Sequence, residues 1–487
     1  MLRRVGLLAL AAAGLSALWH FGPGLRAPSL EVPSQGFVLT GVTVVDPRVT
    51  VVDPGGGRIP ARTLTVRGGR IERIEAAEPE GATGPYSGGF VLPGLIDLHA
   101  HHPPAWAPGE RELYALLFLA HGVTTVRETG SFFGGIEPHR RRIEAGALAG
   151  PRTLSCGPFL DGDPPLWPGA RVVTDAASAR IAVAELAQAG VDCVKVYNGV
   201  SAASLAAIRE AASAHDLPVV AHVPWRLSLA HMGDAEVQHL MGLTRTWNEI
   251  PAERIAWFVE TSLRNGTAHT PTLVAFAQGA KLAEEVEQLR EEPASRLVPA
   301  HYREIFWDPE QNPLVLALSR ASGRQWAPRV SHMKAVVRAL HAAGVPVLAG
   351  SDTGNPFVVP GASLQAELWH LVDAGLTAEE AWLAATQRAA AALGRPSLGR
   401  LAPGAPADLL VFRDDPTRDL SALATLEAVV ADGRLYPKTA LDAALERQRS
   451  HFDGRLRATL SRWGARLLVA AAKLHQRRGS GGGSSAQ

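Results

Sequence analysis

Cysteine is scarce in this chain, in which Cys156 and Cys193 are the only two among 487 residues. Two cysteines exclude a disulfide framework and a cysteine-rich metal site. Both lie in apolar runs of strand-like character. We therefore expect two buried thiols, with a single disulfide between them as the alternative.

An excess of charge of either sign is also missing. Lys and Arg number 48 and Asp and Glu 47, which gives a formal net charge of +1. This balance gives no indication of nucleic-acid binding, which depends on a strongly basic surface. With 46% hydrophobic and 20% charged residues, the composition is that of an ordinary globular protein. The length allows one large domain plus a smaller one.

A long apolar run occurs at the N-terminus. Two arginines precede residues 5–21, which carry no formal charge apart from any on His20. This pattern predicts an export signal or a short membrane anchor over residues 1–27. Trp19, His20 and Phe21 stand where a signal-peptide cleavage site would have small residues. An anchor that is not cleaved is therefore an alternative to a removed signal. A buried helix is the alternative, but the flanking arginines and prolines favour a protein that is periplasmic, extracellular or anchored facing outside the cytoplasm.

Two different periodicities divide the rest of the chain. Residues 36–90 and 398–436 alternate apolar and polar side chains, which predicts one small composite β-sandwich built from both segments. Residues 91–397 alternate strand and helix patterns, and eight such units predict an α/β fold, a (β/α)8 TIM barrel. The strands are expected at residues 91–98, 123–127, 152–157, 191–197, 218–223, 235–240, 268–274 and 345–351.

Three segments fall outside these patterns. Residues 278–329 are rich in charge, Trp and Pro and too long for an ordinary connection, so we expect helices over the barrel mouth. Residues 438–478 repeat apolar side chains at helical spacing among many arginines, which predicts a basic amphipathic helical extension. That helix either packs on its own protein or binds an anionic membrane surface. Residues 479–487 are a flexible tail.

Side chains that ligate metals stand at the ends of the predicted strands. His99 and His101 end an apolar strand at positions i and i+2, which places both imidazoles on one face. Such a pair suits a divalent transition metal, most often zinc. Further candidates end later strands in the same way, namely Lys195, His222, His239 and Asp352. A lone histidine there is more often structural, but six such residues in this order predict a metal site.

With these residues identified, residues 36–436 resemble the amidohydrolase superfamily in its prolidase-like and imidazolonepropionase-like branch. The motifs that carry the resemblance are VLPGLID, HAH, GVTTVRETG, VKVYNG, AHV, QHL, GSDT, LGRLAPGAPADLLVF and VVADGR. The resemblance implies a site with two divalent metals, for which we expect zinc.

The resemblance also implies a role for each ligand. His99 and His101 would hold the more buried metal, and His222 and His239 the more exposed one. Lys195 would bridge the two metals as a carbamate, because a deprotonated amine that captures carbon dioxide presents two anionic oxygens. Asp352 would ligate the first metal and transfer protons.

The predicted chemistry is hydrolysis by a metal-bound hydroxide. Two metals that share one water lower the pKa of that water toward 7. The more exposed metal then polarises the substrate oxygen, while Asp352 passes the proton to the leaving group. Tyr197 faces the same side of its strand as Lys195 and either donates a hydrogen bond to the oxyanion or packs. We expect cleavage of an amide, lactam or ester bond, first of all in a dipeptide or an N-acyl amino acid.

Other functions stay open at this point. If Lys195 is unmodified, a mononuclear site of the cyclic amidase or deaminase type remains, with His239 polarising the substrate. A lactone or phosphotriester hydrolase is another alternative, and a catalytically silent, membrane-associated scaffold is the non-enzymatic one. A substrate carboxylate would require a cation near the mouth, for which Arg127, Arg226 and Arg245 are available. We expect a small-molecule substrate, a homo-oligomer and no nucleic-acid partner.

Overall fold

A computed structural model of the chain describes residues 29–46, 57–77 and 84–480, except residues 106, 108, 131–134, 168, 245–246, 248, 283 and 323–325. The predicted export segment at residues 1–27 and all but the first two residues of the predicted tail lie outside the described residues, so both stay predictions. Among the helices of the described part, none combines the length and the hydropathy that crossing a membrane requires.

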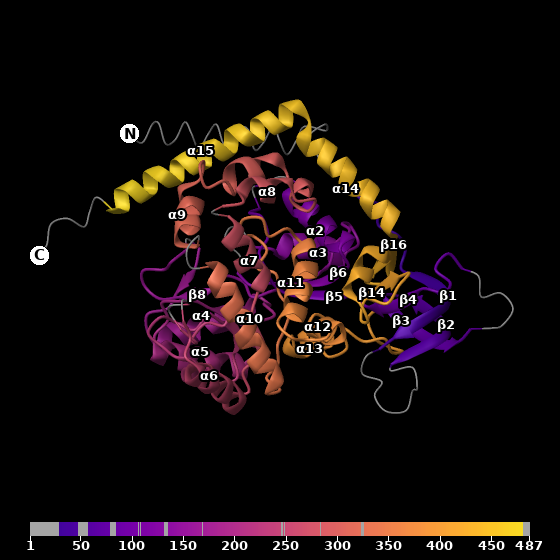
Figure 1. Ribbon diagram of the computed structural model, residues 1–487, viewed down its shortest axis with the longest axis horizontal. Coiled ribbons are helices and arrows are strands. Elements are labelled where there is room, and N and C mark those ends of the chain that lie inside the picture. The colour runs from indigo at the N-terminus through magenta and orange to yellow at the C-terminus, as the bar shows by residue number, and fades with distance from the viewer. Residues whose placement is uncertain are drawn as a thin grey trace, which may run out of the picture.

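One sheet takes its strands from both ends of the chain (Figure 1). In pairing order its strands are β16 (Arg434–Pro437), β15 (Leu426–Ala431), β14 (Leu409–Phe412), β4 (Phe90–Pro93), β1 (Gly36–Val45), β2 (Arg58–Arg67) and β3 (Arg70–Ala76). Their alternating apolar residues share one core, in which Val42, Leu64, Val91 and Leu409 are fully buried. Residues 36–90 and 398–436 thus contribute to a common sheet, while the domain boundaries stay predictions.

The strand expected at residues 91–98 is in fact two strands. β4 pairs with β14 in the composite sheet, and β5 (Leu95–Ala100) begins the parallel part of the fold. Gly94 separates them, because a Cβ atom at this position would lie 2.0 Å from Thr124 Oγ1. Close packing against the neighbouring strand β6 (Val123–Glu128) therefore requires glycine here.

Two parallel sheets form the centre of the α/β region. The first pairs β5 with β6 and β6 with β7 (Arg152–Ser155). The second contains β13 (His269–Thr270), β12 (Glu236–Gln238), β11 (Val219–Ala221), β10 (Val194–Val196), β8 (Leu160–Asp161) and β9 (Arg171–Val172). The parallel pairing is consistent with the predicted barrel.

Backbone hydrogen bonds also connect strands outside these ladders. The Asp192 N–H, just before β10, donates to the Ser155 carbonyl of β7 at 2.7 Å. The Leu98 N–H of β5 donates at 3.2 Å to the Ala349 carbonyl, within the segment expected to be the eighth strand. That segment forms only an isolated parallel bridge, between Val347 and His269.

Helices follow the strands and cover the parallel sheets (Figure 1). They are α2 (Glu110–Ala120), α3 (Glu137–Glu144), α4 (Ala176–Gln188), α5 (Ala202–Ala214), α6 (Ala252–Asn265), α10 (Trp326–Ala342), α11 (Ala362–Asp373), α12 (Ala378–Ala384) and α13 (Gln387–Ala392), with the 3-10 turns η1 (Leu229–His231) and η4 (Leu420–Thr425). Side-chain caps stabilise the N-termini of α4, α5 and α12. Asp175, Ser201 and Thr377 each accept a hydrogen bond from a backbone N–H of the first helical turn.

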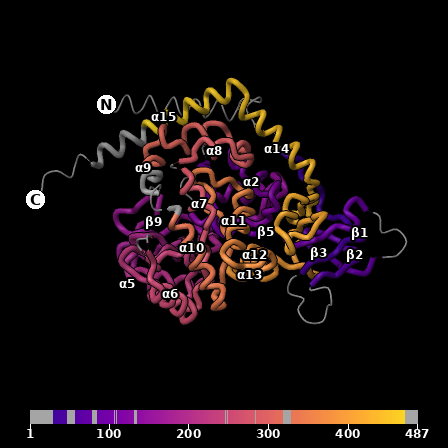
Figure 2. Tube along the Cα trace, viewed as in Figure 1, coloured from indigo at the N-terminus to yellow at the C-terminus, as the bar shows by residue number. Residues whose placement is uncertain are grey.

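The long segment at residues 278–329 is helical, as predicted. It comprises the end of α7 (Leu273–Lys281), α8 (Val286–Glu291), the 3-10 turn η2 (Ser295–Leu297), the π-helical turn η3 (Tyr302–Phe306) and α9 (Pro313–Ser322). The C-terminal extension is also helical, but Gly454 divides it into α14 (Lys438–Asp453) and α15 (Arg455–Ser480). Figure 2 shows these two helices at the outer edge of the molecule.

The two cysteines form a disulfide, so the expectation of two buried thiols was wrong. The bond joins Cys156, just after β7, to Cys193, just before β10, across 37 residues of sequence. These two segments are neighbours at one edge of the parallel sheets, where their Cα atoms lie 4.4 Å apart. That proximity comes from the packing of strands that are distant in the sequence, so the residues around each cysteine do not predict it.

Removing this cross-link should destabilise the fold. A disulfide that closes a loop of this length contributes about 4 kcal/mol by restricting the unfolded chain. We expect Cys156→Ala with Cys193→Ala to lower the urea midpoint of unfolding. Reductant should lower the midpoint of the wild-type protein and leave that of the double variant unchanged. Equal midpoints for the two proteins under oxidising conditions would contradict the bond.

Candidate metal centre

A cavity of about 330 Å³ lies at the C-terminal ends of the parallel strands. All six predicted ligands and Tyr197 line it: His99, His101, Lys195, Tyr197, His222, His239 and Asp352. These residues come from β5, β10 and the residues that follow β11, β12 and the eighth strand segment. The structure therefore brings together all six predicted ligands and Tyr197.

Asp352 stands closest to the centre of this group. Its Oδ1 atom lies 3.3 Å from His99 Nε2 and 3.5 Å from His101 Nε2, and its Oδ2 atom lies 3.8 Å from His239 Nδ1. His99, His239 and Asp352 offer ligand atoms within 4.8 Å of one another. The ring of His222 lies beside that of His239, with centroids 4.9 Å apart.

Amide side chains fix the orientation of two of the imidazoles. Gln238 donates through Nε2 to Glu236, which leaves its Oε1 atom to accept from His99 Nδ1 at 2.5 Å. With its proton on Nδ1, His99 keeps the lone pair of Nε2 for the cavity. Asn198 Oδ1 holds His222 Nδ1 in the same way at 2.9 Å. Outer contacts of this kind set the tautomer of metal-binding histidines.

His239 is held by a hydroxyl group. Its Nδ1 atom lies 2.7 Å from Thr272 Oγ1, and that hydroxyl donates its own proton to the Pro271 carbonyl. The hydroxyl oxygen therefore accepts from His239, which directs the Nε2 lone pair away from this contact.

A buried ion pair supports the amide of Gln238. Arg127 is fully buried and places two guanidinium nitrogens on the Glu236 carboxylate, at 2.7 and 2.5 Å. Burial raises the pKa of Glu236, but Arg127 and hydrogen bonds outweigh that effect and hold the pKa below its usual value. Glu236 thus stays ionised and orients Gln238.

The described part of the structure places none of the three arginines that were candidates for binding a substrate carboxylate in the cavity lining. Arg127 is committed to Glu236 and does not line the cavity, so the suggestion was wrong for this residue. Arg226 is exposed and lies outside the cavity lining. Arg245 falls outside the described residues, and its role stays a prediction.

Lys195 is the most unusual ionisable group in the cavity. Its side chain is 1% exposed, and its Nζ atom makes no hydrogen bond within the described part of the chain. Burial lowers the pKa of Lys195 to about 7. A neutral buried amine is the form that reacts with carbon dioxide, so this residue fits the carbamate that the sequence predicted.

The histidines are divided between two protonation states. Burial lowers the pKa of His239 to about 4 and holds those of His99 and His222 well below their ordinary value, so these rings are neutral ligands. Burial also acts on His101, but Asp352 and Glu128 outweigh it and raise the pKa of His101 to about 9. Two carboxylates thus favour positive charge at a point that a divalent cation could occupy.

The backbone is strained around the same cavity. His239, Thr272 and Asp352 have φ angles of 59°, 51° and 59°, in the left-handed region that non-glycine residues rarely adopt. Each such residue costs about 1–3 kcal/mol, and strain of this kind gathers at functional sites. The three residues turn the chain sharply where it leaves the parallel strands.

Four further aromatic side chains line the cavity and were not predicted from the sequence. Tyr114, Phe159, Trp167 and Tyr302 join Tyr197 in the lining. The Tyr197 hydroxyl accepts from Trp167 Nε1 at 2.8 Å, and its ring stacks on Phe159. Burial raises the pKa of Tyr197 to about 12, so the hydroxyl keeps its proton for donation. These residues lie on separate elements, so no local motif announces them.

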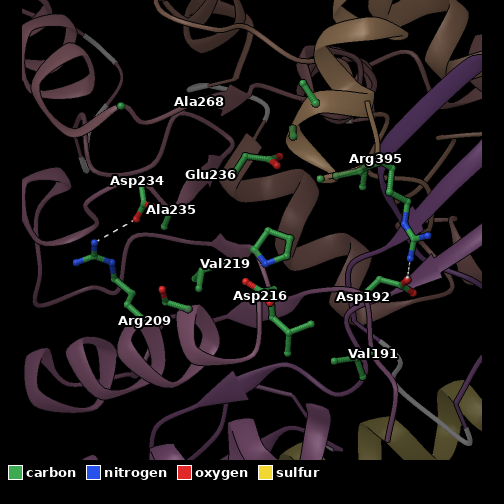
Figure 3. Close-up of a pocket in the computed structure, with 18 of the residues that line it drawn as sticks. Val191, Asp192, Arg209, Asp216, Val219, Asp234, Ala235, Glu236, Ala268 and Arg395 are labelled. Carbon is green, nitrogen blue, oxygen red and sulfur yellow. Dashed lines mark hydrogen bonds and ion pairs between the residues drawn. The ribbon is translucent and has the colours of Figure 1, made fainter. Parts of the chain in front are cut away.

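A larger cavity, of about 1080 Å³, lies at the opposite ends of the strands (Figure 3). Its charged residues are largely paired with one another, as Arg209 is with Asp234 at 3.2 Å and Arg395 with Asp192 at 2.6 Å. Its lining includes no histidine. In α/β folds with parallel strands, catalytic and binding groups gather at the C-terminal ends of the strands, and so the smaller cavity is the candidate site.

Comparison with known proteins identifies the family of the chain. The model of the Amidohydrolase family matches residues 90–436. The chain belongs to the amidohydrolase family. Bottromycin amidohydrolase is similar to this amidohydrolase with a TM-score of 0.69 and 25% identity, over 90% of this chain and 96% of its own. A protein from Bifidobacterium longum described as a prolidase has a TM-score of 0.61 and 27% identity, over 85% of this chain and 99% of its own.

An uncharacterized protein of Mycobacterium tuberculosis (strain H37Rv) is also similar, with 28% identity over 395 residues, which cover 75% of this amidohydrolase and 90% of the relative. The chain is therefore a prolidase-like amidohydrolase, an enzyme that hydrolyses carbon–nitrogen bonds. This family generally uses divalent metal. The scaffold alternative is set aside.

Gln238 provides a test of the arrangement around His99. We expect Gln238→Leu to weaken zinc binding about 10- to 100-fold, because His99 loses the acceptor that fixes its tautomer. Competition with a chelator measures this affinity in the purified protein. The matched control is Gln365→Leu, since Gln365 donates to the backbone carbonyl of His121, away from the cavity. Equal zinc affinity for both variants, with unchanged circular dichroism, would contradict the role of Gln238.

Proposed function

We propose that this amidohydrolase cleaves the amide bond of a dipeptide or an N-acyl amino acid with the help of two zinc ions. The proposed ligands are His99, His101, His222, His239, Asp352 and the carbamate of Lys195. The single observation that carries the proposal is the buried Lys195 Nζ, which lacks a hydrogen-bond partner among the described residues and shares one cavity with the four histidines proposed as ligands. The hydrogen bonds of Asp192 with Ser155 and of Leu98 with Ala349 support a closed (β/α)8 barrel as the scaffold.

Each protein group has a defined part in the reaction. When bound, the metals supply Lewis acidity and lower the pKa of water. The Asp352 carboxylate accepts a proton from the attacking water and delivers it to the leaving nitrogen. The water oxygen first bonds to the carbonyl carbon, and the carbon–nitrogen bond breaks once the leaving nitrogen has received the proton from Asp352. Tyr197 donates a hydrogen bond to the carbonyl oxygen as negative charge develops there.

The cavity wall favours a substrate with an apolar group beside the scissile bond. Tyr114, Phe159, Trp167 and Tyr302 provide aromatic surface that excludes water from the reacting atoms. A free carboxylate on the substrate requires a cation, for which we propose Arg245 in the connection between β12 and α6. An ester with the same acyl group would meet the same residues.

The disulfide supports the proposal that the enzyme works outside the cytoplasm. Disulfides persist in oxidising compartments and are rare where thiols are kept reduced. Cys156 and Cys193 form such a bond, and an export signal at residues 1–27 would deliver the chain to such a compartment.

Asp352 is the residue on which turnover should depend most strongly. We expect Asp352→Asn to reduce kcat by at least about a thousandfold, because an amide cannot take up the proton. The measurement is hydrolysis of a panel of dipeptides and N-acyl amino acids, with circular dichroism to verify folding. Asp373→Asn, a change at an exposed carboxylate on α11, should leave kcat unaltered. Full activity of the Asp352 variant would overturn the mechanism.

Lys195 decides between one metal and two. We expect about two metals per chain when the protein is prepared with bicarbonate, and fewer in Lys195→Ala, as determined by elemental analysis. Lys334→Ala is the matched control, because Lys334 pairs with Asp373 outside the cavity. One metal per chain in all three proteins would instead support the mononuclear alternative of a cyclic amidase or deaminase.

A further inference from the structure

Large apolar side chains on α15 face the solvent. Leu456, Trp463 and Leu467 are 71%, 50% and 40% exposed, and the half-buried Leu460 lies between the first two. The intervals of four, three and four residues place all four on one face of the helix. We call these residues the apolar stripe. An exposed apolar patch of this kind marks a surface that a partner covers.

The same helix concentrates positive charge. Its seven cations are Arg455, Arg457, Arg462, Arg466, Lys473, Arg477 and Arg478, and it contains no Asp or Glu. The whole chain has 48 cations against 47 carboxylates, so the remainder has 41 against 47. The positive charge of α15 is thus a local feature on an otherwise acidic protein.

The face of α15 that meets the protein does not include the apolar stripe. Ala465 and Val469 are buried with Ile305 of η3 in a small cluster of their own. Arg462 donates two hydrogen bonds to Glu304, at 2.6 and 2.9 Å. Packing on the body of the enzyme therefore fixes the helix and leaves the apolar stripe exposed.

We propose that α15 binds the surface of an anionic lipid bilayer, with the apolar stripe inserted at the level of the headgroups. Arg455 and Arg466 are exposed next to the apolar stripe, where they would meet lipid phosphates. Apolar side chains flanked by cations, on a helix too polar to span, are typical of helices that lie in the interface. A second copy of the chain is disfavoured as the occupant, because two helices with seven cations each would repel one another.

The attachment point of α15 lies close to the candidate site. Glu304 and Ile305 of η3 hold α15, while Tyr302 of the same turn lines the substrate cavity. Tyr302 also donates to Glu110 Oε2 at 2.6 Å, at the start of α2. The proposed lipid-binding helix is thus mounted beside the cavity wall. This proposal does not depend on the identity of the substrate.

A fluorescent label on the helix tests the proposal in the full-length protein. Both native cysteines are in the disulfide, so bimane attached to Leu467→Cys reports on the apolar stripe alone. The control is Val38→Cys, an exposed apolar position on β1. With vesicles that contain phosphatidylglycerol and spin-labelled lipid, we expect quenching at position 467 and none at position 38. With vesicles of phosphatidylcholine alone we expect no quenching at either position.

Charge variants of the labelled protein test the electrostatic part. Arg455→Gln with Arg466→Gln should weaken partitioning onto the anionic vesicles about 30-fold, at about fivefold for each cation. Arg67→Gln with Arg413→Gln makes the same change of net charge on the composite sheet and should have no effect.

Three results would overturn the proposal. The first is a label at position 467 that anionic vesicles leave unquenched, and the second is equal quenching by neutral vesicles. The third is a change in the bimane emission at position 467 when the protein concentration is raised in the absence of lipid. That result would identify a second copy of the chain as the partner. Because the label reports the position of α15 itself, attachment through residues 1–27 alone would not imitate the expected result.

Discussion

The buried ion pair of Arg127 and Glu236 is the interaction on which the candidate site depends. It links β6 to β12 across the interior, and Arg127 Nε also donates to the Leu98 carbonyl on β5 at 2.7 Å. Removing one partner of such a pair leaves an uncompensated charge at a cost of about 3–5 kcal/mol. Because Glu236 in turn orders Gln238, which holds His99, the ion pair determines which nitrogen of His99 faces the cavity.

The ion pair also explains why the cavity can combine neutral and charged groups. Burial, followed by the charge of Arg127, lowers the pKa of Lys195, while Asp352 and Glu236 oppose them. Glu236 neutralises Arg127 locally, so the interior does not carry the unpaired cation that would otherwise repel a metal. The neutral imidazoles of His99, His222 and His239, together with a lysine of lowered pKa, thus face carboxylates, and this set of groups suits a divalent cation.

The ligands could be predicted from the sequence because each stands at the end of an apolar strand, and parallel strands end at the same edge of a sheet. The groups that orient them could not be predicted. Gln238 orients His99 only because the fold places β12 beside β5. Asn198 orients His222 only because the residues after β10 lie beside those after β11. The disulfide was missed for the same reason, since its partners meet through strand pairing. The division of β4 from β5 coincides with the pair Pro93-Gly94 in the sequence. Only the close contact with Thr124 explains why glycine is required there.

The parallel sheets and the segments added to them have different roles in the enzyme. The candidate ligands lie at strand ends, where strained residues such as His239 and Asp352 are held by the surrounding sheet. The aromatic wall takes Tyr302 from η3, within the long helical segment between β13 and the eighth strand segment. A change in that segment alters the shape of the cavity without disturbing the ligands. The chemistry therefore follows from the family, whereas the choice of substrate follows from residues that the family pattern does not determine.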